Sequence, residues 1–305
     1  MDDTAFIIDA HVHTYPNVTV GRQALGPLGY GYAGTMEDLK EVMKQANLSY
    51  AVTANMTPTQ EMIKANLATL DSRLTPDQEK EAIQGIHRKV IERMQRRNQW
   101  TCQSASESPQ LVPLISFDVI QSPEEMVEEL TTKATQMGAK GVKLHPIASE
   151  YFPWDQRLWP LYAKAQELKL PILFHSGASE LPNYESKYGR PSEFIKVAEG
   201  FPRLTIVLAH LGKGYFEEAI ELAQRTANIF FDTSGCFLGF GPPTPEIINK
   251  VGSVIKKIGI TRVMFGSDWP WFDPAKDIAI IKNMEFTSRE RSMILGENAK
   301  RIYNL

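Results

Sequence analysis

The sequence lacks the features that mark secreted, membrane-bound or nucleic-acid-binding proteins. It has 2 cysteines in 305 residues, too few for a framework of disulfide bonds. No uninterrupted apolar run approaches the roughly 18 residues that a membrane-spanning helix requires. Its 33 basic and 36 acidic side chains leave a net charge of −3, so no basic excess would attract nucleic acid or an anionic membrane. The acidic start, Met1-Asp2-Asp3, is unlike a signal peptide. These absences predict a cytoplasmic protein whose partner is a small molecule.

Short apolar runs alternate with helical patterns along most of the chain. Hydrophobic residues make up 43% and charged residues 23% of the sequence, as in an ordinary globular protein. Eight runs are apolar on both faces, which is typical of buried parallel strands. They span Phe6–Ala10, Tyr50–Ala54, Leu111–Phe117, Gly141–Leu144, Pro171–Phe174, Leu204–Ala209, Ile229–Asp232 and Arg262–Gly266. Eight strands separated mostly by helices predict an α/β fold, the (β/α)8 TIM barrel, as a single domain over residues 1–305. A doubly wound open sheet would explain the alternation equally well, but no G-x-G-x-x-G motif follows a strand here.

Two segments are longer than simple connections between strands and helices. Thr14–Thr35 follows the first expected strand, and Met56–Pro109, which is largely helical, follows the second. Both leave the C-terminal ends of their strands, so both would extend over the face where barrel enzymes place their active sites. The second segment could equally be ordinary helix of the outer ring. Capping signals at Thr75–Gln78 and Ser122–Glu125 predict that helices begin at these two places.

Histidines are concentrated at the C-terminal ends of the expected strands. Five of the six lie there, namely His11, His13, His145, His175 and His210, and Asp268 ends the last strand. All strands of a parallel barrel end at one face, so these side chains should converge. His11 and His13 are two residues apart and therefore point the same way. Neutral imidazole suits Zn, Fe, Ni or Cu, and a carboxylate with a further imidazole would complete a shell that leaves room for water. A single such histidine could be a core residue, but five in matching places predict a metal or proton-transfer site.

The motifs that contain these residues resemble the amidohydrolase superfamily. They read D-A-H-V-H, G-V-K-L-H-P, I-L-F-H-S-G, I-V-L-A-H-L-G, F-D-T-S-G and F-G-S-D-W-P along successive strands, and the final I-L-G-E-N-A-K-R-I is similar to the last helix of that superfamily. The resemblance is to the branch that includes aminocarboxymuconate-semialdehyde decarboxylase, related aromatic-acid decarboxylases and pyrone-dicarboxylate lactonases. It extends over nearly the whole chain and is weakest in the two long segments.

The resemblance implies a site for one divalent metal ion. Its ligands would be His11, His13, His175 and Asp268, and Zn²⁺ is the expected ion, although Mn²⁺ and Fe²⁺ also accept nitrogen and oxygen ligands. Asp268 could instead orient a histidine from behind, or it could accept a proton from bound water. Lys143 matches the position of a carboxylated lysine that bridges two metals in binuclear members, but this branch usually binds one ion.

The resemblance also implies catalytic and substrate-binding residues. His210 would lie beside the metal-bound water, as a general base or an electrostatic partner. His145 could contact substrate or a second metal, or it could simply end its strand. Arg190 could clamp a substrate carboxylate or be a solvated loop residue. Aromatic residues that could wall or cover the site are Trp269, Trp271, Tyr30 and Tyr32.

Three functions are compatible with these residues. The first is a metal-dependent hydrolase that uses metal-activated water on an amide, lactone or ester of a small acidic substrate. The second is a non-oxidative, metal-dependent decarboxylase of an aromatic or unsaturated acid, which would use the same ligands, so the motifs do not separate the two reactions. The third, a binding protein that kept the barrel, does not explain why imidazoles occupy these strand ends. Some lactonases of the branch work without metal, and the resemblance makes a homodimer plausible.

Overall fold

Eight parallel strands form one sheet in the computed structural model, which describes residues 6–26, 31–179, 185–237 and 242–305. The strands are β1 (Ile7–Val12), β2 (Leu48–Ala54), β3 (Leu111–Ser116), β4 (Gly141–Leu144), β5 (Ile172–Phe174), β6 (Ile206–Leu208), β7 (Ile229–Asp232) and β8 (Val263–Met264). Each strand pairs in parallel with the next one in the sequence. This order confirms the predicted (β/α)8 barrel.

The barrel closes where the chain after β8 meets β1. The backbone N–H of Ala10 donates to the carbonyl of Phe265 at 2.9 Å, and the N–H of Asp268 donates to the carbonyl of His11 at 2.9 Å. A third bond, 2.7 Å long, runs from the N–H of His13 to the carbonyl of Trp269. These bonds join β1 and the residue after it to the chain that follows β8, and they place Asp268 beside His11 and His13.

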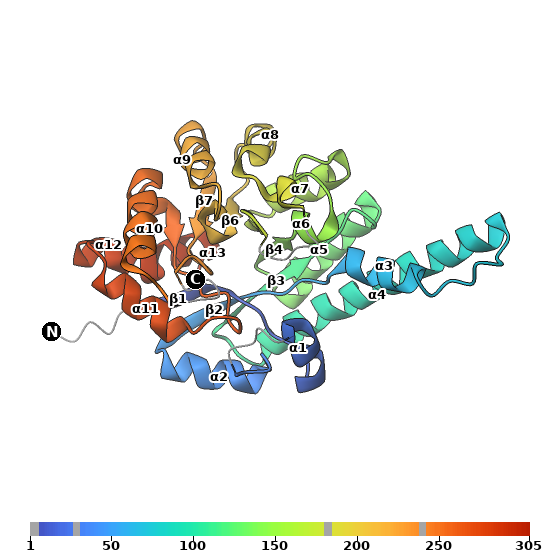
Figure 1. Ribbon diagram of the computed structural model, residues 1–305, viewed down its shortest axis with the longest axis horizontal. Coiled ribbons are helices and arrows are strands. Elements are labelled where there is room, and N and C mark those ends of the chain that lie inside the picture. The colour runs from blue at the N-terminus through green and yellow to red at the C-terminus, as the bar shows by residue number, and fades with distance from the viewer. Residues whose placement is uncertain (1–5, 27–30, 180–184, 238–241) are drawn as a thin grey trace.

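Helices surround the sheet and connect its strands (Figure 1). The α-helices are α1 (Val18–Leu25), α2 (Met36–Gln45), α3 (Thr59–Leu67), α4 (Pro76–Ser106), α5 (Pro123–Met137), α6 (Pro146–Ser149), α7 (Trp159–Glu167), α8 (Ile195–Gly200), α9 (Phe216–Arg225), α10 (Pro245–Ile258), α11 (Pro274–Asn283), α12 (Ser288–Ser292) and α13 (Asn298–Tyr303). Short 3-10 turns are η2 (Gln156–Leu158), η3 (Ser186–Gly189), η4 (Pro191–Phe194), η5 (Ala209–Gly212) and η6 (Ile260–Arg262), and η7 (Met293–Glu297) is a π-helical turn. None of the helices in the described ranges combines the length and the apolar character needed to span a bilayer.

The core consists of two main apolar layers because successive residues of a strand point to opposite faces. One layer contains alternate strand residues such as Ile8, Leu173 and Val207 and is closed by Tyr303 of α13. The other contains the intervening residues, such as Ile172, together with the helices that pack on them. The two layers correspond to the filled interior of a barrel and its outer ring of helices.

The capping signals in the sequence define the starts of two helices. Thr75 and Ser122 each accept a hydrogen bond from the backbone N–H of the third residue of the helix, and Gln78 and Glu125 reach back to the cap residue. Such reciprocal bonds satisfy backbone donors that would otherwise have no partner at a helix start. The helices therefore begin at the two places that the sequence predicts.

The long segment after β2 has two parts. The C-terminal half of α4 packs against the barrel, where the Asn98 side chain donates to the carbonyl of Ser116 at 2.8 Å. The N-terminal half of α4 projects from the barrel together with α3 (Figure 1). Ile63, Ile86 and Val90 form a small apolar cluster between α3 and α4. The segment is thus partly outer-ring helix and partly an arm.

Candidate metal centre

A compact group of side chains lies at the seam between β1 and the chain after β8, and it consists of His11, His13 and Asp268. It is called the metal group below. Nε2 of His13 lies 3.1 Å from Oδ1 of Asp268 and 3.2 Å from Nε2 of His11. Nε2 of His11 is 3.6 Å from the same carboxylate oxygen. One potential ligand atom from each of these three residues lies within 4.8 Å of the others. Two imidazoles and one carboxylate are a donor set that suits a first-row divalent metal.

Asp268 reaches this group through a strained turn. Its backbone has φ +65°, in the left-handed region that aspartate tolerates better than most residues. The neighbouring backbone bond from its N–H to the carbonyl of His11 fixes the turn against β1. Strained backbone of this kind persists where the surrounding structure holds it and is frequent at functional sites.

The charge states of the group match those of metal ligands. Burial is the main cause that lowers the pKa of His11 to about 4, and the nearby Lys143 lowers it further. Burial also lowers the pKa of His13. Burial alone would raise the pKa of Asp268, but the hydrogen bond to His13 and the nearby imidazoles hold it well below the ordinary value. At neutral pH the group therefore consists of neutral imidazoles and an ionised carboxylate, the forms that bind metal.

Lys143 faces the same group from β4. Its Nζ lies 3.2 Å from Nε2 of His11, and its side chain is buried. Burial lowers the pKa of this amine to about 8, and the carboxylates of Asp232 and Asp268 partly oppose the change. The amine therefore lies beside His11, at the position that corresponds to the bridging lysine of binuclear superfamily members.

The other three strand-end histidines form a second cluster next to the first. Nε2 of His210 lies 3.1 Å from Nδ1 of His175, and the rings of His175 and His145 stack with centroids 4.0 Å apart. The ring centroid of His210 is 5.4 Å from that of His11. His175 is not part of the group of His11, His13 and Asp268, but its Nε2 is buried and has no hydrogen-bond partner in the described part of the chain. All five histidines therefore occupy the same end of the barrel.

Two residues of this site were not predicted from the sequence, namely Asp232 at the end of β7 and Ser234 just after it. Oδ2 of Asp232 lies 3.0 Å from Nδ1 of His11, and the hydroxyl oxygen of Ser234 lies 2.8 Å from Nδ1 of His210. The F-D-T-S-G motif contains both residues, so their place after a strand was the available signal. They connect the two histidine clusters.

Arg190 does not contact the histidines in the structure. It lies between η3 and η4, where its guanidinium pairs with Glu218 of α9 and covers the ring of Tyr215 at 5.0 Å. The Arg190 side chain is 47% exposed, so it lies at the surface of the protein. Its predicted role in binding a substrate carboxylate therefore has no support from its present contacts.

The aromatic residues that were expected to wall the site have different surroundings. Trp269 is fully buried, with its ring centroid 6.0 Å from that of Tyr32, whereas the Trp271 ring meets His13 edge-on at 5.2 Å. Trp271 rather than Trp269 thus lies against the metal group. Tyr30 lies outside the residues that the structure describes.

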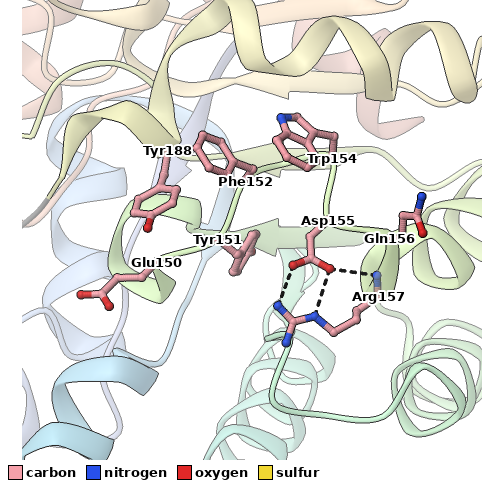
Figure 2. Close-up of a pocket in the computed structure, with 8 residues that line it drawn as sticks. All are labelled: Glu150, Tyr151, Phe152, Trp154, Asp155, Gln156, Arg157 and Tyr188. Carbon is pink, nitrogen blue, oxygen red and sulfur yellow. Dashed lines mark hydrogen bonds and ion pairs between the residues drawn. The ribbon is translucent and has the colours of Figure 1, made fainter.

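Most residues that line an aromatic pocket come from the segment after His145 (Figure 2). Its volume is 360 Å³, and its lining residues are Glu150, Tyr151, Phe152, Trp154, Asp155, Gln156, Arg157 and Tyr188. The rings of Phe152 and Trp154 stack with centroids 4.9 Å apart, and Asp155, the residue after Trp154, pairs with Arg157. None of the five strand-end histidines lines it, so this pocket is separate from the metal group.

Comparisons with known proteins agree with this geometry. A family model described as Amidohydrolase matches residues 8–305. Gamma-resorcylate decarboxylase from a Rhizobium species is 24% identical, over 73% of this chain and 80% of that protein. The solved structure of 5-carboxyvanillate decarboxylase from Sphingomonas paucimobilis superposes with a TM-score of 0.71 at 17% identity, covering 99% of both chains. A dihydroxybenzoic acid decarboxylase from Polaromonas sp., solved with manganese and 2-nitroresorcinol, gives 0.71 at 14% identity, over 99% of this chain and 97% of the other.

Proposed function

Because the chain belongs to the amidohydrolase family, we propose that it is a metal-dependent decarboxylase of an aromatic carboxylic acid. The observation that carries the proposal is the group of His11, His13 and Asp268 at the strand ends of a barrel whose similar proteins include gamma-resorcylate decarboxylase. The sequence alone favoured hydrolysis and left decarboxylation as the alternative. The named relatives support the alternative, because those compared above are decarboxylases.

The residues fit one divalent metal ion. Three ligand atoms would come from His11, His13 and Asp268. The buried Nε2 of His175 has no hydrogen-bond partner in the described residues, so it could be the fourth ligand atom. A bound ion would polarise oxygen atoms of the substrate and hold the acid in place. Zinc is the ion expected from the sequence, and manganese is the ion named for the Polaromonas structure. We propose that the protein uses one of these two ions.

The reaction requires a proton donor and no redox partner. The bond between the ring carbon and the carboxylate carbon breaks, carbon dioxide leaves, and the electron pair that remains on the ring carbon takes up one proton. His210 is the proposed donor, and it would hold the transferred proton at Nε2 because Nδ1 is engaged with Ser234. The carboxylate of Asp232, which accepts from the backbone N–H of His210 at 3.0 Å, would stabilise the charged ring.

The buried surroundings would favour loss of the carboxylate. The Trp271 ring meets the ring of His13 edge-on, and His11 and Lys143 are almost fully buried. Electrostatic interactions are stronger in such a site than in water.

The test is release of carbon dioxide from aromatic acids by protein loaded with Mn²⁺ or Zn²⁺. The panel should include 2,6-dihydroxybenzoate and 5-carboxyvanillate, the acids that occur in the names of similar proteins. We expect carbon dioxide and the matching phenol in equal amounts, and no product from the double variant His11→Ala/His13→Ala. Hydrolysis of a lactone, ester or amide panel without release of carbon dioxide would overturn the proposal in favour of a hydrolase.

A further inference from the structure

A chain of hydrogen bonds begins at the buried carboxylate of Asp232. Its Oδ2 faces Nδ1 of His11 at 3.0 Å. Its Oδ1 accepts from the backbone N–H groups of His210 and Ser234, both at 3.0 Å, and from the hydroxyl of Ser234 at 2.5 Å. Because Oδ1 already accepts three hydrogen bonds, the ionised form of this carboxyl group is favoured, and an ionised carboxylate can only accept.

The partners of His210 assign the proton positions on two rings. Nδ1 of His210 lies 2.9 Å from the backbone carbonyl of Ser234, and a carbonyl only accepts, so this nitrogen carries a proton. In the neutral ring, Nε2 is then an acceptor, and it faces Nδ1 of His175 at 3.1 Å. Nδ1 of His175 must therefore be the donor. The remaining nitrogen of His175, the buried Nε2 without a partner, is left unprotonated.

The same reasoning fixes His11. Its Nδ1 lies against the ionised carboxylate of Asp232 and so carries the proton. Its Nε2 is unprotonated and lies among His13, Asp268 and Lys143. Two rings from different strands thus present an unprotonated Nε2, the form in which an imidazole binds a metal.

We propose that Asp232 is a positioning residue that fixes the ring protons of His11 directly and those of His175 through Ser234 and His210. The carboxylate sets His11 by accepting from Nδ1, and it sets His210 by holding the backbone and hydroxyl of Ser234 beside that ring. The assignment of ring protons holds for the metal-free protein before substrate binds. Only its consequence for metal affinity rests on the proposed function.

An amide at position 232 could not do the same. The two oxygens of Asp232 together take bonds from His11, from His210 and twice from Ser234. In asparagine one of these oxygens becomes an NH₂ group, which cannot accept and would face a donor instead. The substitution Asp232→Asn therefore forces either His11 or the turn at His210 to change its hydrogen bonds, with little change in side-chain volume.

The test combines proton positions with metal affinity. Long-range proton–nitrogen NMR of histidine-labelled, metal-free protein distinguishes rings protonated at Nδ1 from rings protonated at Nε2. We expect Nδ1 protonation of His11, His175 and His210 in the wild type, and loss of this state at His11 in Asp232→Asn. Competition with a chromophoric chelator should show that Asp232→Asn binds Mn²⁺ or Zn²⁺ about 10- to 100-fold more weakly, the usual cost of losing a residue that orients a metal ligand.

Two further variants separate positioning from general damage. Asp118→Asn alters another buried aspartate at a strand end, one that accepts from Thr59 and from the backbone of Ile120, and it should leave tautomers and affinity unchanged. Ser234→Ala should keep the proton on Nδ1 of His210, because the carbonyl of residue 234 still accepts it, and should cost less affinity than Asp232→Asn.

Several results would overturn the inference. One is a wild-type His175 protonated at Nε2, which is measurable even if Asp232→Asn does not fold. Another is an Asp232→Asn protein with unchanged tautomers and unchanged affinity. If wild-type protein binds neither ion, the proposed function loses its support, while the His11 tautomer in Asp232→Asn still decides the inference.

Discussion

The imidazole rings of His145 and His175 lie face to face, with centroids 4.0 Å apart and planes 10° apart. Burial is the main cause that holds the pKa of both rings well below the ordinary value; the nearby Lys143 lowers that of His145 further, and His145 lowers that of His175 further. The pair is therefore a stack of two neutral rings. His145, which follows β4 directly, thus supports the ring of His175 without needing to touch the metal group itself.

Substitutions of His145 should show this support. His145→Phe keeps a flat ring against His175, whereas His145→Ala removes it, and aromatic pairs contribute about 0.5–1.5 kcal/mol. We expect the alanine variant to bind Mn²⁺ or Zn²⁺ about 2- to 10-fold more weakly than the phenylalanine variant. Chelator competition measures both affinities. Equal affinities in the two variants would show that stacking does not position His175.

Removal of metal should lower the thermal stability of the protein. An ion at about 100 times its Kd contributes about 2.7 kcal/mol to the free energy of unfolding. A protein of this size should then melt about 5 °C higher with metal than after chelation. Differential scanning fluorimetry with and without Mn²⁺ or Zn²⁺ checks this shift. The double variant His11→Ala/His13→Ala should show no shift, and a shift of the same size there would place the ion elsewhere.

Asp277 of α11 should make the protein less stable as the pH rises. The side chain is fully buried, and neither carboxylate oxygen has a hydrogen-bond partner in the described residues. Burial, reinforced by the charges of Asp9 and Asp273, raises its pKa well above 3.8. The folded state therefore binds more protons than the unfolded state above that pH, and the free energy of unfolding falls with rising pH.

The variant Asp277→Asn removes this titration. We measure the free energy of unfolding of variant and wild type in urea. The value for the variant minus the value for the wild type should increase from about pH 5 to about pH 8. The control is Asp155→Asn, because the hydrogen bond from Arg157 lowers the pKa of Asp155 and its titration is complete below this range. The difference between that control and the wild type should stay constant. A constant difference for Asp277→Asn as well would contradict the prediction.

Arg190 is expected to be dispensable for substrate binding. Its guanidinium is engaged with Glu218 at an exposed position, and surface ion pairs of this kind contribute about 0–1 kcal/mol. We expect Arg190→Met to leave kcat and KM in the proposed decarboxylation within about twofold of wild type, with at most a small loss of stability. Steady-state kinetics measure this. A large rise in KM without a change in kcat would contradict this prediction and would show that Arg190 binds substrate.

The sequence predicted most of the strands because burial on both faces leaves a clear apolar run. Gly141–Leu144 was expected as a strand and is β4 with the same bounds. The last strand was expected over Arg262–Gly266 but covers only Val263–Met264. The reason is that Phe265 bonds instead to Ala10 across the seam and to Ile294 of η7. Such bonds depend on how the barrel closes, which local sequence does not encode.

The sequence predicted the site through one rule, namely that all strands of a parallel barrel end at the same face. That rule placed His11, His13 and Asp268 at one face, and the structure brings them together. It did not identify Asp232, because the sequence does not show that this strand-end carboxylate faces a ring nitrogen of His11. The contact of Asp232 with His11 spans 221 residues and joins two strands that are not neighbours in the sheet, so it depends on the closed barrel. The position of Arg190 depended on a loop, which periodicity does not describe.

The metal group also links the first and last parts of the barrel. His13 and Asp268 are 255 positions apart, so no half of the barrel can assemble the group by itself. During synthesis the two histidines leave the ribosome early and acquire their carboxylate partner only when the final strand docks. Contacts of such long sequence separation form late in folding. Retention of the ion therefore reports closure of the barrel, and a mutation that opens the seam between β8 and β1 would release the ion while the rest of the sheet is still paired.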